Sequence, residues 1–371
     1  MALGSSLTVD LSDLHRMDAR VSALSDGTDP PDGSALLAID RFGFSANNVT
    51  YATNASALGF WSFFPAPDGT GHIPVWAHLT VLRSAHEGIS AGDSFYGLAP
   101  MATHLLVSPS KVGPRGFSDD SPNRRGRAPV YNRYLRRGSD PVAAASPSSA
   151  LEVLARPQFT TSFLLAIDLG DHSWYGADAI VVTSASSRTA SGLAHVIGSS
   201  GGRPALVGLT RSDHVTDVRR LGCYDRVLPY EEATSLPVVP TALVDLSGDG
   251  AVVAQLHRHL GDTLTHSAVV GATHRPGQPV DTSTLPGAPR TFFLAPEVAC
   301  RLTERVGEAV AEQSLADAWG SFATAMQDWM RIHEATDIDT IRWVYEQVLS
   351  GSLPPRDGWV LSLRTRPGGG P

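Results

Sequence analysis

Lysine and cysteine are almost missing from this chain of 371 residues. Lys111 is its single lysine, so arginine carries nearly all of the positive charge. The net charge at pH 7 is -8, and this acidic balance argues against broad binding to nucleic acids or membrane surfaces, which both reward a basic face. The two cysteines, Cys223 and Cys300, form no CxxC pair. They argue against a disulfide framework and exclude a four-cysteine zinc site.

Long apolar runs are missing as well. No apolar stretch of the sequence approaches the roughly 20 residues of a membrane-spanning helix. The N-terminal residues lack the basic start and apolar block of a signal peptide. We therefore expect a soluble, cytoplasmic protein with no membrane and no nucleic-acid partner. The length favours two domains, and a hydrophobic content of 42% is enough for two cores.

The first part of the chain has the composition of a β-rich domain. Residues 34–110 contain short runs of β-forming residues, separated by Gly-Asp and similar turn pairs. Residues 111–150 differ, because they are rich in Pro, Gly, Ser and Arg. We expect a long loop or linker there, with one short helix over residues 131–136.

From residue 151 the pattern alternates between helix and strand. An apolar segment of helix length is followed by short apolar runs of the kind that form buried parallel strands. Helical segments lie between these runs, and the repeated β-α-β units predict a doubly wound parallel sheet with helices on both faces. Near the end, an amphipathic helix carries core residues at helical spacing: Leu315, Trp319, Phe322, Met326 and Trp329.

The stretch from Ala177 to Gly198, "ADAIVVTSASSRTASGLAHVIG", has the strand-turn-helix form of a dinucleotide-binding turn without its glycines. Such a turn must bend tightly, bring N–H groups close to a pyrophosphate and start a helix there. Serine and alanine are small, and serine can also cap a helix and donate its hydroxyl. We expect nucleotide contacts from five residues of the turn: Ser184, Ser186, Ser187, Arg188 and Thr189. Alternatively, the scaffold no longer binds a nucleotide, and Ser186 and Arg188 only cap the helix.

The residues after the next strand indicate which nucleotide the turn would bind, NAD or NADP(H). An acidic residue after it would favour the ribose hydroxyls of NAD, but Thr210, Arg211 and Ser212 follow this strand instead. An arginine at this point suits a 2'-phosphate, which predicts NADP(H) as the cofactor.

Several segments, taken in chain order, resemble the medium-chain dehydrogenase/reductase superfamily, which includes zinc-free quinone and enoyl reductases. They are "FGFSANNVTYA", "AGDSFYGLAPMATHLLVSP", "RRLGCYDRVLPYEE", "LVDLSGDG" and "AVVGATH". Four others are similar to an uncharacterised subfamily catalogued as a domain of unknown function: "VYNRYLR", "RPQFTTSFLL", "SASSRTASGLA" and "GLTRSDHV".

The resemblance implies a fold and an assembly. It implies a GroES-like β-rich substrate domain over residues 1–149, completed by residues 335–371, and a Rossmann-like nucleotide-binding domain over residues 150–334. It also implies a homodimer that forms through the edge strand near Thr291 to Leu294.

The implied activity is a zinc-independent, NADP(H)-dependent reduction of a conjugated enone, acyl thioester or quinone, with secondary metabolism as one setting. The two cysteines do not supply a catalytic zinc site, and His257 and His259 do not share a helical face. Without a metal, hydrogen-bond donors must polarise the carbonyl group. The candidate catalytic residues are Asn48, Tyr51, Tyr131, Tyr134 and His274, and the candidate substrate-binding residues are Asn47, Asn132, Phe159, Thr161 and Ser162.

Other interpretations remain open at this point. The asparagine and tyrosine residues also suit hydrogen bonding within loops and turns. Thr161 and Ser162 also suit the start of a helix after Pro157. The missing glycines favour a non-redox lyase, hydratase or isomerase of a β-hydroxy or β-keto acyl compound as the alternative function. A non-catalytic binding protein is the third possibility.

Overall fold

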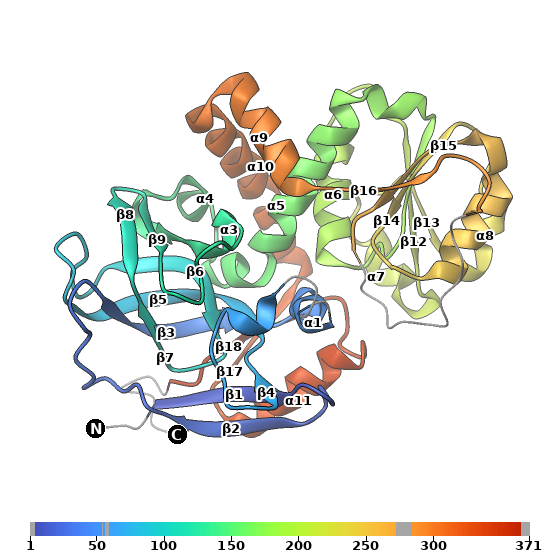
Figure 1. The fold of residues 1–371 in the computed structure, drawn as a ribbon. Coiled ribbons are helices and arrows are strands. Elements are labelled where there is room, and N and C mark those ends of the chain that lie inside the picture. The colour runs from blue at the N-terminus through green and yellow to red at the C-terminus, as the bar shows by residue number, and fades with distance from the viewer. Residues whose placement is uncertain (1–3, 54, 56–58, 272–283, 365–371) are drawn as a thin grey trace. The chain divides into compact units, whose positions relative to one another are not determined.

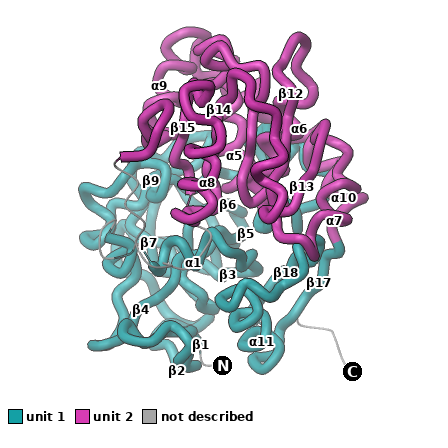
Figure 2. The backbone as a smooth tube through the Cα atoms, turned by 90° about the vertical axis from the view of Figure 1, so that its right-hand side faces the viewer, with its two compact units in different colours: residues 1–154, 331–371 teal, residues 155–330 magenta. Residues whose placement is uncertain are grey.

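The computed structural model describes residues 4–53, 55, 59–271 and 284–364. The chain forms two compact units, which Figure 2 colours separately. Unit 1 comprises residues 1–154 and 331–371, and unit 2 comprises residues 155–330. The sequence predicted domain boundaries after residues 149 and 334. Helix α5 (Ser149–Asp171) carries the chain from the first unit into the second.

Unit 1 is built on a nine-stranded sheet (Figure 1). Its main path runs β17 (Arg331–Ala335), β18 (Asp357–Leu361), β3 (Ala35–Gly43), β5 (Pro74–Ser84), β6 (Ser94–Pro100), β10 (Arg133–Arg136), β9 (Gly116–Asp119) and β8 (Pro109–Gly113), and β7 (His104–Val107) also pairs with β3. A three-stranded sheet has the order β2 (Met17–Ser22), β1 (Gly4–Asp10) and β4 (Thr70–Gly71). The helical elements are α1 (Ala46–Thr53), η1 (Phe60–Ser62), α3 (Pro129–Asn132), η2 (Arg137–Ser139), α4 (Pro141–Ala144) and α11 (Ile338–Leu349).

The Pro- and Arg-rich segment after residue 110 is more regular than the sequence predicts. Strands β8, β9 and β10 extend the large sheet, and the expected helix over residues 131–136 is wrong, because α3 ends at Asn132 and β10 follows it. Strand pairing explains the difference. Tyr134 is fully buried and stacks on Phe117 of the neighbouring strand, with ring centroids 4.8 Å apart. This packing outweighs the weak local preference of the segment.

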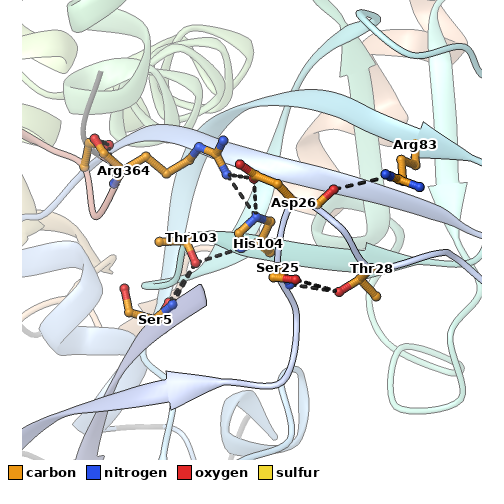
Figure 3. A network of polar contacts seen from close by, with 9 residues as sticks. Ser5, Ser25, Asp26, Thr28, Arg83, Thr103, His104 and Arg364 are labelled. Carbon is orange, nitrogen blue, oxygen red and sulfur yellow. Dashed lines mark hydrogen bonds and ion pairs between the residues drawn. The ribbon is translucent and has the colours of Figure 1, made fainter. Parts of the chain in front are cut away.

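A polar network around the buried His104 joins two segments of unit 1 that are far apart in the sequence. Figure 3 shows His104 at its centre, with Nδ1 2.8 Å from the Thr103 hydroxyl and Nε2 2.8 Å from Asp26. The Ser5 N–H donates to the Thr103 hydroxyl, and Arg364 donates to the same Asp26 oxygen at 2.8 Å. The hydrogen bonds from His104 and then Arg364 hold the pKa of the Asp26 carboxyl below its usual value. The network therefore fixes the first strand and the C-terminal segment to one buried histidine.

Unit 2 contains a six-stranded parallel sheet (Figure 1). The strand order is β13 (Arg226–Pro229), β12 (Ala205–Thr210), β11 (Ala179–Val182), β14 (Thr241–Asp245), β15 (Leu264–Val269) and β16 (Arg290–Phe292). The helical elements are α5, η3 (Ser173–Gly176), α6 (Arg188–Gly198), η4 (Ser212–His214), α7 (Val215–Arg219), η5 (Tyr230–Ser235), α8 (Gly250–Leu260), η6 (Gly261–Thr263), α9 (Ala295–Val306) and α10 (Glu308–Trp329).

Alternate residues of the central strands of this sheet face two different cores. Ile180 and Val182 pack with Leu193 of α6, while Val181 packs with Leu256 of α8. The short apolar runs of the sequence are buried on both faces, as parallel strands between helices require. The predicted fold class, a doubly wound parallel sheet together with a β-rich domain, is confirmed.

Two long helices complete unit 2. Helix α5 continues through Pro157, so Thr161 and Ser162 lie in its second half and not at a helix start. In α10, Trp319, Phe322 and Met326 are buried as the periodicity predicts. Among the described residues, no helix combines the length and the apolar character needed to cross a bilayer.

Candidate functional site

The serine-rich turn lies at the carboxyl end of β11, at the centre of the parallel sheet of unit 2. The strand ends at Val182 and α6 begins at Arg188. Ser187 is the N-cap of the helix, and its hydroxyl accepts a hydrogen bond from the Ala190 N–H at 3.2 Å. The strand order reverses between β11 and β14, so this turn lies at the switch point where doubly wound sheets bind their ligands.

Ser184 adopts the left-handed backbone conformation that glycine usually supplies. Its φ is 50°, and the residue is buried. Its carbonyl accepts a hydrogen bond from the Ser187 N–H at 2.8 Å, which closes the turn. Its own N–H donates to the Tyr230 hydroxyl at 2.8 Å. A left-handed serine costs free energy, and such residues persist only where the surrounding contacts fix them.

Ala185 occupies the next position of the turn and is fully buried against β12. Its N–H donates to the Leu209 carbonyl at 2.9 Å, and its carbonyl accepts from the Tyr224 hydroxyl at 3.3 Å. A Cβ placed on Gly208 of β12 would lie 2.8 Å from the Ala185 Cβ and 3.0 Å from the Tyr224 ring. A glycine on the neighbouring strand therefore makes room for the side chain in the turn.

Ser186 connects the turn to the end of β12. Its hydroxyl accepts from the Thr210 hydroxyl at 3.3 Å and lies 3.2 Å from His214 Nδ1. Thr210 is buried, whereas the following Arg211 and Ser212 are exposed. The structure thus brings the predicted residues Ser186 and Thr210 together, and adds His214.

The two predicted arginines differ in their surroundings. Arg188, the first residue of α6, is half-buried, and burial lowers the pKa of its guanidinium to about 10. The exposed Arg211 forms a bidentate pair with Asp213, with N–O distances of 3.1 and 2.6 Å. The carbonyl of Thr189 accepts from the Ser162 hydroxyl at 2.7 Å, which ties the start of α6 to α5.

A buried carboxylate joins the ends of the two central strands. Asp245, the last residue of β14, accepts from the hydroxyls of Thr183 at 2.9 Å and Ser247 at 2.8 Å. Its other oxygen pairs with Arg290 at 3.0 Å. In the sequence Asp245 stands out only as part of the segment "LVDLSGDG", whereas the fold shows that it holds the ends of β11 and β14 together.

The predicted residues of unit 1 fall into two groups. Tyr51 is buried, and its hydroxyl accepts from the Trp76 indole N–H at 3.2 Å and is hydrogen-bonded to Asn47. Its ring packs edge-on against Tyr131, with centroids 6.2 Å apart. Burial raises the pKa of both tyrosines. The structure thus brings Asn47, Tyr51 and Tyr131 together.

The other group makes bonds within the framework of unit 1. Asn48 accepts from the Ser45 N–H at 2.9 Å and donates to the Pro74 carbonyl at 2.8 Å. The fully buried Tyr134 donates to the Leu98 carbonyl at 2.7 Å. Asn132 donates to the backbone carbonyl of Arg124 at 2.8 Å.

The remaining candidates lie in unit 2 or outside the described residues. Phe159 of α5 is buried and stacks on Phe322, with centroids 4.7 Å apart. Thr161 is half-buried, and Ser162 is buried against the start of α6. His274 lies outside the described residues. Within the described ranges, no group of three or more His, Cys, Asp and Glu residues is arranged to hold a metal ion.

Comparison with known families assigns the chain to one of them. The model of the family described as "Protein of unknown function (DUF2855)" matches residues 42–354. The chain belongs to this family. The predicted membership of such a subfamily is confirmed. None of the curated proteins matches the sequence.

Several solved structures share the fold. CurA from Vibrio vulnificus in complex with NADPH is 11% identical, with a TM-score of 0.60 over 98% of this chain and 100% of that one. A mutant enoyl thioester reductase from Candida tropicalis is also 11% identical, with a TM-score of 0.57 over 98% and 100%. The yhdH oxidoreductase from Salmonella enterica in complex with NADP is 14% identical, with a TM-score of 0.53 over 97% and 100%. The predicted likeness to enoyl reductases is confirmed at the level of the fold.

The contact between Gly208 and Ala185 gives the first testable prediction. Gly208→Ala forces a Cβ into a space 2.8 Å from the Ala185 Cβ, and overpacking of this kind costs about 1–3 kcal/mol. We expect the melting temperature to fall by several degrees. Gly201→Ala is the matched control, because a Cβ there has nothing within 4 Å. Equal melting temperatures for the two variants would show that the turn does not depend on Gly208.

Proposed function

We propose that this chain is a cytoplasmic, zinc-independent reductase that uses NADPH to reduce a conjugated enone, acyl thioester or quinone. The observation that supports this most is the left-handed Ser184, which bends the chain from β11 into α6 at the switch point of the sheet. Backbone strain at such a point is typical of ligand-binding turns. The NADP and NADPH complexes among the similar structures, and the enoyl thioester reductase, support the choice of cofactor and substrate class.

The residues of the turn fit a dinucleotide. The backbone N–H groups of Arg188 and Thr189 lie in the first turn of α6, where the positive end of the helix dipole favours an anion. Ala185, Ser186 and Ser187 have side chains small enough for a diphosphate to approach the backbone. Arg188 adds a partly desolvated cation at the first helical position. When bound, NADPH supplies the hydride for the reduction.

Arg211 is the residue that we assign to the 2'-phosphate. It follows β12, where the adenosine ribose of a dinucleotide lies in doubly wound sheets, and its guanidinium fork suits a phosphate. Asp213 pairs with this guanidinium and partly neutralises it. A 2'-phosphate must therefore compete with Asp213 for Arg211.

This competition gives the second prediction. We expect wild-type protein to bind NADPH in the micromolar range and NADH much more weakly in a fluorescence titration. Arg211→Ala should weaken NADPH binding about 10-fold or more and leave NADH unchanged, because a charge-assisted bond contributes roughly 1.5–3 kcal/mol. Asp213→Asn should strengthen the binding of NADPH and leave the binding of NADH unchanged. The control is Arg220→Ala, which removes an exposed arginine paired with Asp217.

Failure of both nucleotides to bind would overturn this function. The non-redox lyase, hydratase or isomerase would then become the leading interpretation, since the Ser184 N–H in the turn is already bonded to Tyr230. Equal affinities for NADPH in wild type and Arg211→Ala would remove only the assignment of the 2'-phosphate.

We propose Tyr51 as the proton donor, because of the hydrogen bonds and the pKa of its hydroxyl. Its hydroxyl oxygen accepts from Trp76, so its own proton is available to a carbonyl oxygen. Burial raises the pKa of Tyr51 and keeps it neutral, while the bonds to Trp76 and Asn47 lower the pKa in part and favour the phenolate as the proton leaves. No metal is required in this role, because the hydroxyl donates a hydrogen bond, and then its proton, to the carbonyl oxygen on which the negative charge develops.

The third prediction tests this donor. Tyr51→Phe should lower kcat for NADPH consumption about 100-fold with a responsive enone, quinone or acyl thioester, as expected for loss of a general acid. The affinity for NADPH should stay the same. Tyr345→Phe is the matched control, because that buried hydroxyl donates to the Leu14 carbonyl. An unchanged kcat in Tyr51→Phe would move the role to another donor, with Tyr131 next to be tested.

We also propose that the protein is a homodimer. Strand β16 forms one edge of the parallel sheet, and its Phe292 is 75% exposed. Leu294, just beyond the strand, is 50% exposed. An exposed apolar edge strand offers unpaired backbone groups to a second copy of the same strand.

The fourth prediction concerns this edge. Light scattering should give a mass of about twice 39.3 kDa for wild-type protein. Phe292→Asp should shift the protein toward the monomer. Val21→Asp, at a 73% exposed valine of unit 1, should not. A monomeric wild-type protein, or a Phe292→Asp dimer of unchanged strength, would contradict the proposed interface.

A further inference from the structure

Two tyrosines flank strand β13 and reach the glycine-free turn at the end of β11. Tyr224 precedes the strand, and its hydroxyl donates to the Ala185 carbonyl at 3.3 Å. Tyr230 follows the strand as the first residue of η5, and its hydroxyl accepts from the Ser184 N–H at 2.8 Å. Strands β13 and β11 are separated by β12, so both side chains reach across a strand to the turn. Burial raises the pKa of both phenols, which keeps them neutral.

The Tyr230 hydroxyl acts on the one residue of the turn whose backbone is strained. Ser184 has a φ of 50°, a conformation that a glycine adopts freely and that other residues adopt at a cost. The N–H that Tyr230 accepts belongs to this residue, and the Ser184 hydroxyl also lies 3.5 Å from the Tyr230 hydroxyl. The contact therefore holds both the backbone and the side chain of Ser184.

The position of Ser184 in turn sets the start of α6. Its carbonyl accepts from the Ser187 N–H at 2.8 Å, and Ser187 is the N-cap of the helix. A rotation of the backbone at Ser184 would move the carbonyl and with it the N-cap. The N–H groups of Arg188 and Thr189, which we assign to the diphosphate, would then point elsewhere.

We propose that Tyr230 is a positioning residue of the nucleotide site. Its hydroxyl accepts a hydrogen bond that holds Ser184 in the left-handed conformation. A glycine at residue 184 would adopt this conformation without such a bond. The expected effect on NADPH binding rests on the proposed function. The hydrogen bond itself, and the dependence of Ser184 on it, do not rest on that function. The Tyr230 hydroxyl is thus needed because residue 184 is a serine and not a glycine.

A double-mutant cycle tests the pair in the full-length protein. Tyr230→Phe removes only the hydroxyl, and we expect it to raise the Kd for NADPH about 10-fold, in line with the loss of one buried hydrogen bond. Ser184→Gly alone gives the reference Kd for the second half of the cycle, because glycine adopts the same φ without help from a hydrogen bond. In the Ser184→Gly background, Tyr230→Phe should raise the Kd less than about 3-fold. This rescue is the result that a general packing defect at Tyr230 would not give.

Tyr224→Phe is the matched control. It removes a neighbouring buried hydroxyl that bonds to Ala185 and not to Ser184. Any loss that it causes should persist in the Ser184→Gly background. If the loss from Tyr230→Phe also persists there in full, Tyr230 does not act through Ser184 and the inference is overturned.

Melting temperatures without nucleotide separate this inference from the proposed function. Tyr230→Phe should lower the melting temperature by a few degrees in the serine background and by clearly less in the glycine background. If wild type binds no NADPH but this coupling is present, the proposed function fails and the positioning of the turn stands. If Tyr230→Phe does not fold, folding of the double variant is the expected rescue. Failure of the double variant, when Ser184→Gly alone folds, overturns the inference.

Discussion

The backbone of unit 2 has to leave a buried strand and enter a helix with five residues between Val182 and Arg188, and Ser184 makes this possible. A left-handed residue redirects the chain in one step, and its carbonyl then caps the turn at Ser187. Glycine is the usual residue for this step because it has no Cβ to strain. Here a serine takes the conformation, and the free energy that it costs has to come from contacts around it. The Tyr230 hydroxyl is one such contact.

The space that glycines would leave in the turn is provided by its neighbours. Ala185 fits because Gly208 on the adjacent strand has no side chain. On the other side, a Cβ on Gly192 of α6 would lie 2.8 Å from the Ser162 hydroxyl of α5, so a second glycine lets the two helices approach closely. That approach allows Ser162 to bond to the Thr189 carbonyl. Glycines outside the turn therefore provide part of the close packing that the turn's own glycines usually provide.

The sequence predicted what depends on local patterns. Short apolar runs marked the parallel strands because both faces of such a sheet are buried, and the serine turn was found because strand, turn and helix follow one another directly. It could not predict Tyr230, because the contact joins residues 46 positions apart and only the sheet order brings them together. The same holds for Tyr134, whose strand forms only through pairing with other strands. Whether the proposed residues act in catalysis depends on a substrate, which no sequence pattern specifies.

The net charge at the carboxyl edge of the parallel sheet depends on the partners of Asp245. An uncompensated carboxylate at this edge would oppose an anionic ligand, since two like charges 4 Å apart repel by about 4 kcal/mol at an effective dielectric constant of 20. Asp245 is buried, and Arg290 pairs with one of its oxygens while Thr183 and Ser247 donate to the other. Its charge is therefore compensated within unit 2. Arg290 belongs to the edge strand β16, so a residue far along the chain from the turn neutralises this carboxylate. A diphosphate would then meet helix N–H groups and Arg188, and the buried carboxylate would not repel it.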